Sequence, residues 1–225
     1  MADIGPHHHP EADLLLDYAA GKTSQAGSVL VATHLALCPT CRREVRDYES
    51  LGGLLMETTP PESLSDGALS AVLARLDDSI DEAEDLPRPM QPLDPETVRL
   101  VPEPLRSFLS AGIDALPWKT RGIGVREAML DIGDPAVRTS LVRIAPGGRV
   151  LSHTHGDVEH TLVLKGAYSD GIGRYARGDV CVATPEIDHT PVADMSEECL
   201  CLIVVEGGLK FTGPFSRLLN PLMPR

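Results

Sequence analysis

The chain has 225 residues and a formal net charge of −13 at neutral pH, and this length suits one large domain or two small ones. Its 42% hydrophobic and 24% charged residues are ordinary for a soluble globular protein, and no run approaches the ~20 apolar residues that cross a bilayer. The acidic N-terminus lacks the apolar core of a signal peptide. We therefore expect a cytoplasmic protein, whose five cysteines favour a metal or redox site over a disulfide framework.

The negative charge is concentrated in the first 85 residues. They hold 16 Asp and Glu against 5 Lys and Arg, whereas the rest of the chain holds 17 against 15. Such an acidic region is repelled by phosphates, which argues against a DNA-binding regulator that uses it as a zinc finger. It would suit a basic protein partner, although acidity that only keeps the region soluble explains the charge equally well.

These first 85 residues also carry apolar side chains at helical spacing. Helix start and stop signals are present, such as Pro and acidic residues before the first helix and Gly21 after it. The predicted helices span residues 10–21, 24–38, 41–57 and 65–85, and the last one has an apolar stripe formed by Leu69, Val72, Leu73, Leu76 and Ile80. We expect a small all-α, four-helix domain with one core, which would benefit from a metal ion.

Residues 85–104 contain six prolines and are predicted to be an extended linker, because proline removes donors and restricts its neighbours. Downstream, short apolar or alternating runs are separated by Gly and Pro, which is typical of an all-β barrel or sandwich. The sequence therefore predicts a multidomain α + β protein. Its parts are a helical zinc domain at 1–85, a Pro-rich linker at 86–104 and an all-β metal-binding domain at 105–225.

His34, Cys38 and Cys41 form the first candidate metal site. His34 and Cys38 are four residues apart and lie on the same face of a helix, and Pro39 lets the chain turn before Cys41. Two thiolates and an imidazole are three of the four ligands of a tetrahedral structural zinc ion. The histidine run at 7–9 offers the fourth ligand, unless it is a disordered tail or a tag remnant. A redox pair or two unrelated core thiols are the alternatives, but the βαβ context of a thioredoxin-type motif is missing.

This pattern, on an acidic helical region, resembles the N-terminal zinc-binding domain of ChrR-type anti-sigma factors. The segments "YAAG", "VATHLALCPTC" and "GGLLMETTP" carry the resemblance, and matching through "YAAG" places the family's N-terminal zinc ligand on His9. The resemblance implies that four helices clasp a sigma factor of the extracytoplasmic-function class and occlude its polymerase-binding surfaces. The acidic charge fits a partner with basic surfaces.

His153, His155, Glu159 and His189 form the second candidate metal site. His153 and His155 are two residues apart and point to the same face of a strand, while Glu159 follows a short turn and His189 comes from a later strand. Three imidazoles and one carboxylate could bind Zn, Fe(II), Mn, Ni or Cu. His160 is expected to face the other side of its strand as a structural or surface residue.

The spacing from Gly147 through this site to Gly166 resembles the first motif of the cupin family. The second motif is looser, because Ile187 stands where a glycine is usual, and this departure weakens a cupin enzyme more than it weakens metal binding. The resemblance implies a C-terminal cupin barrel. With both modules in the ChrR-type order, it further implies that a sensory cupin domain is needed to release the sigma factor under an oxidative signal such as singlet oxygen or organic peroxide.

Cys199 and Cys201 share one face of a predicted strand. Buried cysteines commonly act as small hydrophobic residues, which is the favoured interpretation. The alternative hypothesis makes this pair a redox sensor beside the cupin metal, and it requires a low thiol pKa and access for the oxidant.

Two functions from different classes therefore remain. The leading hypothesis is an anti-sigma factor, a negative regulator of transcription that is not an enzyme. The alternative is a dioxygenase-like cupin metalloenzyme with an accessory zinc domain, which predicts an open metal position and a substrate pocket. The acidic HxxxCxxC region, which an enzyme would not need, favours the anti-sigma hypothesis.

Overall fold

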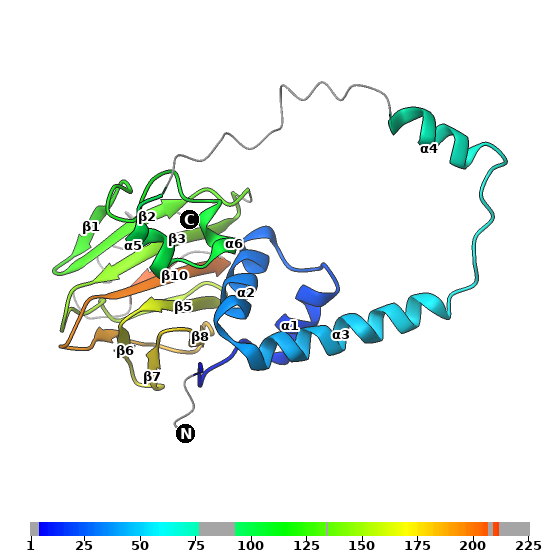
Figure 1. Ribbon diagram of the computed structural model, residues 1–225. Coiled ribbons are helices and arrows are strands. Elements are labelled where there is room, and N and C mark those ends of the chain that lie inside the picture. The colour runs from blue at the N-terminus through cyan, green and yellow to red at the C-terminus, as the bar shows by residue number, and fades with distance from the viewer. Residues whose placement is uncertain (1–4, 77–92, 134, 207–208, 212–225) are drawn as a thin grey trace.

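The computed structural model describes residues 5–76, 93–133, 135–206 and 209–211, and it places a helical N-terminal part beside a β-rich C-terminal part (Figure 1). This arrangement agrees with the predicted fold class. The helices are α1 (Ala12–Ala19), α2 (Gln25–Leu37), α3 (Pro39–Glu57), α4 (Ala68–Leu76), α5 (Pro95–Leu100) and α6 (Glu103–Arg106). The strands are β1 (Lys119–Gly122), β2 (Val125–Leu130), β3 (Val137–Ile144), β4 (His153–His155), β5 (Glu159–Lys165), β6 (Ala167–Ser169), β7 (Arg174–Ala176), β8 (Val180–Ala183), β9 (Val192–Ala193), β10 (Cys199–Glu206) and β11 (Leu209–Phe211).

The largest sheet has the order β1-β2-β3-β10-β5-β8, and its neighbouring strands are antiparallel. Smaller sheets join β7-β6-β9 and β11-β4. Because alternate side chains of a strand face opposite sides, β10 contributes to two cores. Leu200 and Leu202 join the core that includes the helices, whereas Cys199 and Cys201 join a second core formed with the β6–β7–β9 sheet.

Helix α2 packs against both parts of the molecule. A single apolar core unites Leu15 of α1 and Leu30 of α2 with Leu162 of β5 and Leu202 of β10, and α2 also packs against α3 and α6. The Ser24 side chain caps α2 by accepting a hydrogen bond of 3.1 Å from the Gly27 N–H. The helical part and the barrel therefore share buried surface. Among the described residues, no helix combines the length and hydropathy of a membrane span.

The prediction that four helices share one core is wrong for the fourth helix. α4 has no buried residue, and the described members of its apolar stripe are 52–73% exposed. Ile80, the last member of the stripe, lies outside the described residues. An amphipathic pattern predicts a buried face but does not say what covers it, and within the described part of this chain nothing buries this one.

The prediction of an extended linker is also wrong for its final part. Residues 95–100 form α5, and α6 begins before the end of the predicted linker. Prolines occupy the first turn of both helices, where their missing N–H is not needed, and Asp94 caps α5 by accepting a hydrogen bond of 2.9 Å from the Thr97 N–H. Leu100 is buried in the shared core. Residues 77–92 lie outside the described chain, and the domain boundaries at 85 and 104 stay predictions.

Candidate metal centres

His9, His34, Cys38 and Cys41 converge where α2 meets α3. His34 lies in the last turn of α2, and Cys38 is both the C-cap of α2 and the N-cap of α3. The Nε2 atom of His34 lies 3.3 Å from Sγ of Cys41. Nδ1 of His9 lies 3.3 Å from the same sulfur and 3.5 Å from Sγ of Cys38. The structure thus brings all four predicted ligands together, with their ligand atoms within 4.8 Å of one another.

This donor set fits a tetrahedral zinc ion. Zn–S bonds of about 2.3 Å and Zn–N bonds of about 2.1 Å imply N···S edges of about 3.6 Å in a tetrahedron, close to the distances above. Burial raises the pKa of the Cys41 thiol to about 12, and the hydrogen bond and charge of Cys38 act in the same direction. A divalent cation would therefore favour the thiolate form of Cys41 at neutral pH.

His34 is held in the form that binds a metal through Nε2. Its Nδ1 donates a hydrogen bond of 2.8 Å to the carbonyl oxygen of Gly178 in the barrel. Burial lowers the pKa of His34 to about 4, although the hydrogen bond to Gly178 opposes the shift. The ring is therefore neutral at neutral pH, with Nε2 free to act as a ligand atom.

The other two members of the histidine run, His7 and His8, contact the barrel. The N–H groups of His7 and His8 donate to Oδ1 of Asp179, over 2.6 and 3.0 Å, and the His8 ring lies 4.6 Å from the ring of Tyr175. His9 is the member of the run that joins the cluster.

The second cluster contains His153, Glu159 and His189, which are all buried. His153 lies in β4 and pairs with His189 through an isolated antiparallel bridge. Their Nε2 atoms are 3.1 Å apart, and Nε2 of His189 lies 4.0 Å from Oε1 of Glu159. The backbone of His155 pairs with Leu209, but its side chain lies outside the described residues, so its role as a ligand stays a prediction.

The barrel orients both histidines of this cluster, and burial disfavours the charged forms of His153 and Glu159. Nδ1 of His153 donates to the Leu151 carbonyl over 2.7 Å, and Nδ1 of His189 lies 3.2 Å from Oδ2 of Asp170, so each ring presents Nε2. Burial and the charge on His189 lower the pKa of His153 to about 4, while burial raises the pKa of Glu159. A divalent transition metal would favour the ionised carboxylate and fits this nitrogen and oxygen donor set.

Both clusters occur in a chain whose relatives share its two modules. Residues 108–209 match the family model described as the ChrR cupin-like domain. The anti-sigma-E factor ChrR of Cereibacter sphaeroides is 39% identical over 214 residues, which cover 95% of this chain and 96% of that protein. The chain belongs to the ChrR family of anti-sigma factors. The crystal structure of Rhodobacter sphaeroides SigE in complex with the anti-sigma ChrR matches 88% of this ChrR-family chain and 98% of the matched chain, with 39% identity and a TM-score of 0.74.

Cys199 and Cys201 of this ChrR-family chain lie side by side on β10, with their Sγ atoms 3.6 Å apart. Both are buried, with 0% and 2% exposure. The hydrogen bond to Cys199 raises the pKa of the Cys201 thiol, and burial raises it further. A raised pKa and lack of access are the opposite of what a reactive thiol needs, so the geometry favours packing in the second core.

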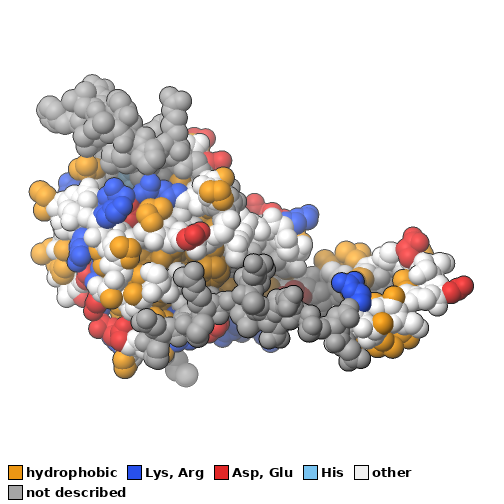
Figure 2. Space-filling model, turned by 90° about the horizontal axis from the view of Figure 1, so that it is seen from above, with side chains coloured by type: hydrophobic (Ala, Val, Ile, Leu, Met, Phe, Trp, Pro, Cys, Tyr) orange, Lys and Arg blue, Asp and Glu red, His pale blue; other side chains and the backbone are white. Residues whose placement is uncertain are grey.

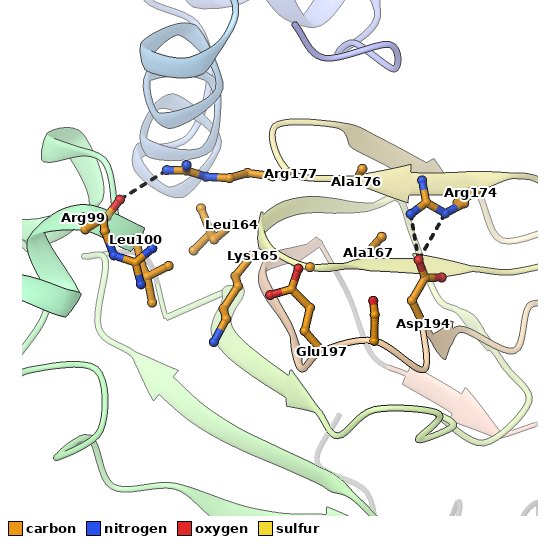
Figure 3. A pocket seen from close by; sticks show the side chains of 12 residues that line it. Arg99, Leu100, Leu164, Lys165, Ala167, Arg174, Ala176, Arg177, Asp194 and Glu197 are labelled. Atoms are coloured by element: carbon orange, nitrogen blue, oxygen red, sulfur yellow. Dashed lines mark hydrogen bonds and ion pairs between the residues drawn. The ribbon is translucent and has the colours of Figure 1, made fainter. Parts of the chain in front are cut away.

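Two pockets in the described chain lie away from both clusters. The larger one has a volume of about 390 Å³ and is bordered by Arg99, Lys165, Arg174 and Arg177, among others (Figure 3). The guanidinium group of Arg174 donates a hydrogen bond of 2.7 Å to Oδ2 of Asp194. The guanidinium group of Arg177 donates one of 3.3 Å to the Arg99 carbonyl. None of the residues that line it is a predicted metal ligand, so it is not the substrate pocket at a metal that the enzyme hypothesis predicts.

Sequence reasoning missed the residues that support the ligands. These residues include Asp170, which lies beside His189, and Asp179, which lies beside the histidine run. Neither residue belongs to a known ligand motif in the sequence. The sequence likewise gives no sign that the carbonyl of Gly178 contacts His34, a residue 144 positions away.

Proposed function

We propose that this protein is an anti-sigma factor that binds and inhibits a sigma factor of the extracytoplasmic-function class in the cytoplasm. The observation that carries the proposal is the similarity over both modules to a relative named as an anti-sigma factor and to a chain solved in complex with SigE. The protein would act by occupying its partner's surfaces, without turnover of a substrate.

An exposed apolar surface on α3 and α4 supports this proposal. In the second half of α3, Leu51, Leu54, Leu55 and Met56 are 53–74% exposed, and the apolar stripe of α4 is exposed as well. Figure 2 shows hydrophobic side chains on the part of the molecule that projects away from the barrel. Exposed apolar side chains grouped on a helix mark protein interaction sites, and we assign sigma-factor binding to these side chains of α3 and α4, which together are called the α3–α4 surface.

Zinc in the N-terminal cluster would serve a structural role. Its four protein ligands leave no open position for a substrate, as in structural zinc sites. They connect three separate segments, namely the residues before α1, the end of α2 and the start of α3. The zinc ion would therefore stabilise the base of α3, from which the α3–α4 surface extends.

The cupin domain would hold zinc or another divalent transition metal and would be needed to release the sigma factor under an oxidative signal such as singlet oxygen or organic peroxide. The shared core supports this part of the proposal, because α2 packs directly against β10. A structural change inside the barrel would therefore alter the packing of α2 against β10. A redox role for Cys199 and Cys201 belongs to the same proposal, although their burial argues against it.

The test measures binding between the full chain and the extracytoplasmic-function sigma factors of its host, together with inhibition of transcription in vitro. We expect a stable complex and inhibition. Substitution of a central residue of the α3–α4 surface, such as Leu54→Glu or Leu73→Glu, is expected to weaken binding at least about 30-fold, as for an interface hot spot. Ile123→Glu is the matched control, because Ile123 is 97% exposed in the barrel, and it should bind like the wild type.

Failure to bind any such sigma factor would overturn the proposal. The metal-loaded full chain would then be assayed for oxygen consumption, since turnover would support the dioxygenase-like alternative.

A further inference from the structure

The turn between β7 and β8 of the barrel contacts the N-terminal metal cluster. The Gly178 carbonyl accepts the hydrogen bond from Nδ1 of His34, over 2.8 Å, and this bond selects Nε2 as the ligand atom. Metal-binding histidines generally need such a partner, because it fixes the orientation and tautomer of the ring. Here the partner comes from the C-terminal domain and not from the helices.

The next residue of the turn holds the segment that leads into His9. Oδ1 of Asp179 accepts the N–H groups of His7 and His8, and the Val180 N–H donates to the His8 carbonyl over 3.0 Å. These bonds run up to the residue before His9. Asp179 therefore positions the backbone that leads into the His9 ring.

Asp179 itself is held firmly by the barrel. It is 2% exposed, its Oδ2 accepts the Ala176 N–H over 2.8 Å, and its backbone bonds to Val163 and Ala176. A buried carboxylate that accepts three N–H groups is an anchor for the N-terminal segment, because each charge-assisted bond is stronger than a neutral one.

Gly178 must be a glycine for two reasons. Its φ of +93° is unfavourable for any residue with a side chain. A Cβ atom added there would lie 2.7 Å from Cγ of Pro6 and 3.6 Å from Cβ of Leu37. The turn therefore fits closely between the N-terminal segment and the end of α2, which both lead to metal ligands.

We propose that residues 176–179 of the barrel form the outer shell of the N-terminal zinc site. Gly178 and Asp179 are positioning residues, which orient His34 and His9, and the barrel thereby sets the zinc affinity of the helical part. This inference rests on the zinc site proposed above. It gives the two modules a direct connection at the zinc ligands, in addition to the shared apolar core.

The test uses the full chain with Co(II) as the probe metal, because cobalt–thiolate absorption reports the site that contains Cys38 and Cys41. Affinity is measured by competition with a chelator. We expect Asp179→Asn and Gly178→Ala each to lower the affinity about 10- to 100-fold, as for other outer-shell changes, and to speed hydrogen exchange at the amides of His7 and His8. Removal of the clash by Pro6→Gly should recover part of the affinity lost in Gly178→Ala.

Two matched controls address damage to the barrel. Asp194→Asn removes a carboxylate that pairs with Arg174, and Gly147→Ala adds a side chain at a φ of +68° where it meets only the Met195 side chain. Both should bind Co(II) like the wild type, even if they lower the melting temperature of the barrel.

The outcomes separate this inference from the zinc site itself. If Cys38→Ser leaves the cobalt–thiolate absorption unchanged, the zinc site is wrong. If Cys38→Ser abolishes it but Asp179→Asn and Gly178→Ala bind Co(II) like the wild type, the outer-shell role is overturned. The role is also overturned if the two controls lose as much affinity as these variants.

Discussion

The two clusters of candidate metal ligands in this protein are assembled in opposite ways. The N-terminal cluster takes three ligands from a short local motif, whereas its supporting groups come from Gly178 and Asp179 in another domain. The cupin cluster collects His153, Glu159 and His189 from separate strands and loops, but its supporting groups come from the same barrel. Local spacing can thus dictate which residues bind a metal while a distant segment dictates how they are aimed. The N-terminal cluster should accordingly depend on the barrel more than the cupin cluster depends on the helices.

The largest expected effect breaks the N-terminal cluster. Cys41→Ser removes a sulfur ligand from the proposed zinc site, and in structural zinc sites metal binding contributes about 10–16 kcal/mol to folding. We expect loss of the N-terminal metal, faster hydrogen exchange in α3 and residues 5–9, and loss of sigma-factor binding. Metal analysis and exchange mass spectrometry measure these changes. Cys199→Ala, at a buried thiol outside the cluster, is the control and should keep the metal; a Cys41→Ser protein that kept it too would contradict the assignment.

The next effect tests whether the cupin cluster can be lost alone. His189→Ala removes one ligand and leaves Asp170 without its histidine, so we expect loss of the cupin metal and a lower melting temperature of the barrel. The cobalt–thiolate absorption of the N-terminal site should remain. His160→Ala is the matched control, since His160 lies on the opposite face of β5 from Glu159. Loss of the N-terminal metal in His189→Ala, with the barrel still folded, would show that the clusters are not independent in this direction.

A smaller effect concerns the supporting group of the cupin cluster. Asp170→Asn weakens the charge-assisted contact to His189, and we expect the affinity of the cupin site for a divalent metal to fall about 10-fold. Calorimetric titration with Zn(II) measures the change, and Asp114→Asn, at an exposed ion pair, serves as the control. An unchanged affinity would mean that Asp170 does not position His189.

The smallest expected effect concerns Glu127, whose ion pairs stabilise the barrel without a metal. Burial alone would raise the pKa of Glu127, but hydrogen bonds and charges from Arg138 and Arg121 outweigh it and hold the pKa below 4.5. The ionised group is therefore stabilising above about pH 4.5, and this stabilisation is lost as the pH falls through the lower pKa of the folded state.

We accordingly expect Glu127→Gln to lower the free energy of unfolding by about 1 kcal/mol at neutral pH, with a difference from the wild type that shrinks below pH 4. Urea unfolding at several pH values measures it, with and without a chelator. A difference that grew on acidification, or that required metal, would contradict the ion-pair explanation.

The sequence predicted the local parts of this structure best. His34, Cys38 and Cys41 are close in the chain, so the end of one helix, the turn at Pro39 and the start of the next helix bring them together. The spacing of His153 and Glu159 follows a strand and a turn. α5 departs from the linker prediction because proline is typical both of linkers and of the first turn of a helix, and Asp94, Pro95 and Thr97 form a recognisable helix start.

The parts that the sequence could not predict depend on packing between distant segments. The apolar stripe of α4 predicts a buried face, but its covering surface is not in the described chain. α2 carries apolar residues on several sides, a pattern that indicates burial in more than one direction, yet the pattern does not identify β10 as the second partner. The contacts of Gly178 and Asp179 with the histidine segment have no local signal, because they arise only once the barrel has formed.

The shared core has a consequence for the order in which the protein folds during synthesis. Leu15 and Leu30 leave the ribosome early, but their partner Leu202 lies near the end of the described chain. The first helices therefore complete their core only after β10 has emerged, and until then their apolar faces are available to chaperones. A message truncated before β10 would yield helices that lack their packing surface. The N-terminal helices can therefore fold fully only when the barrel has been completed.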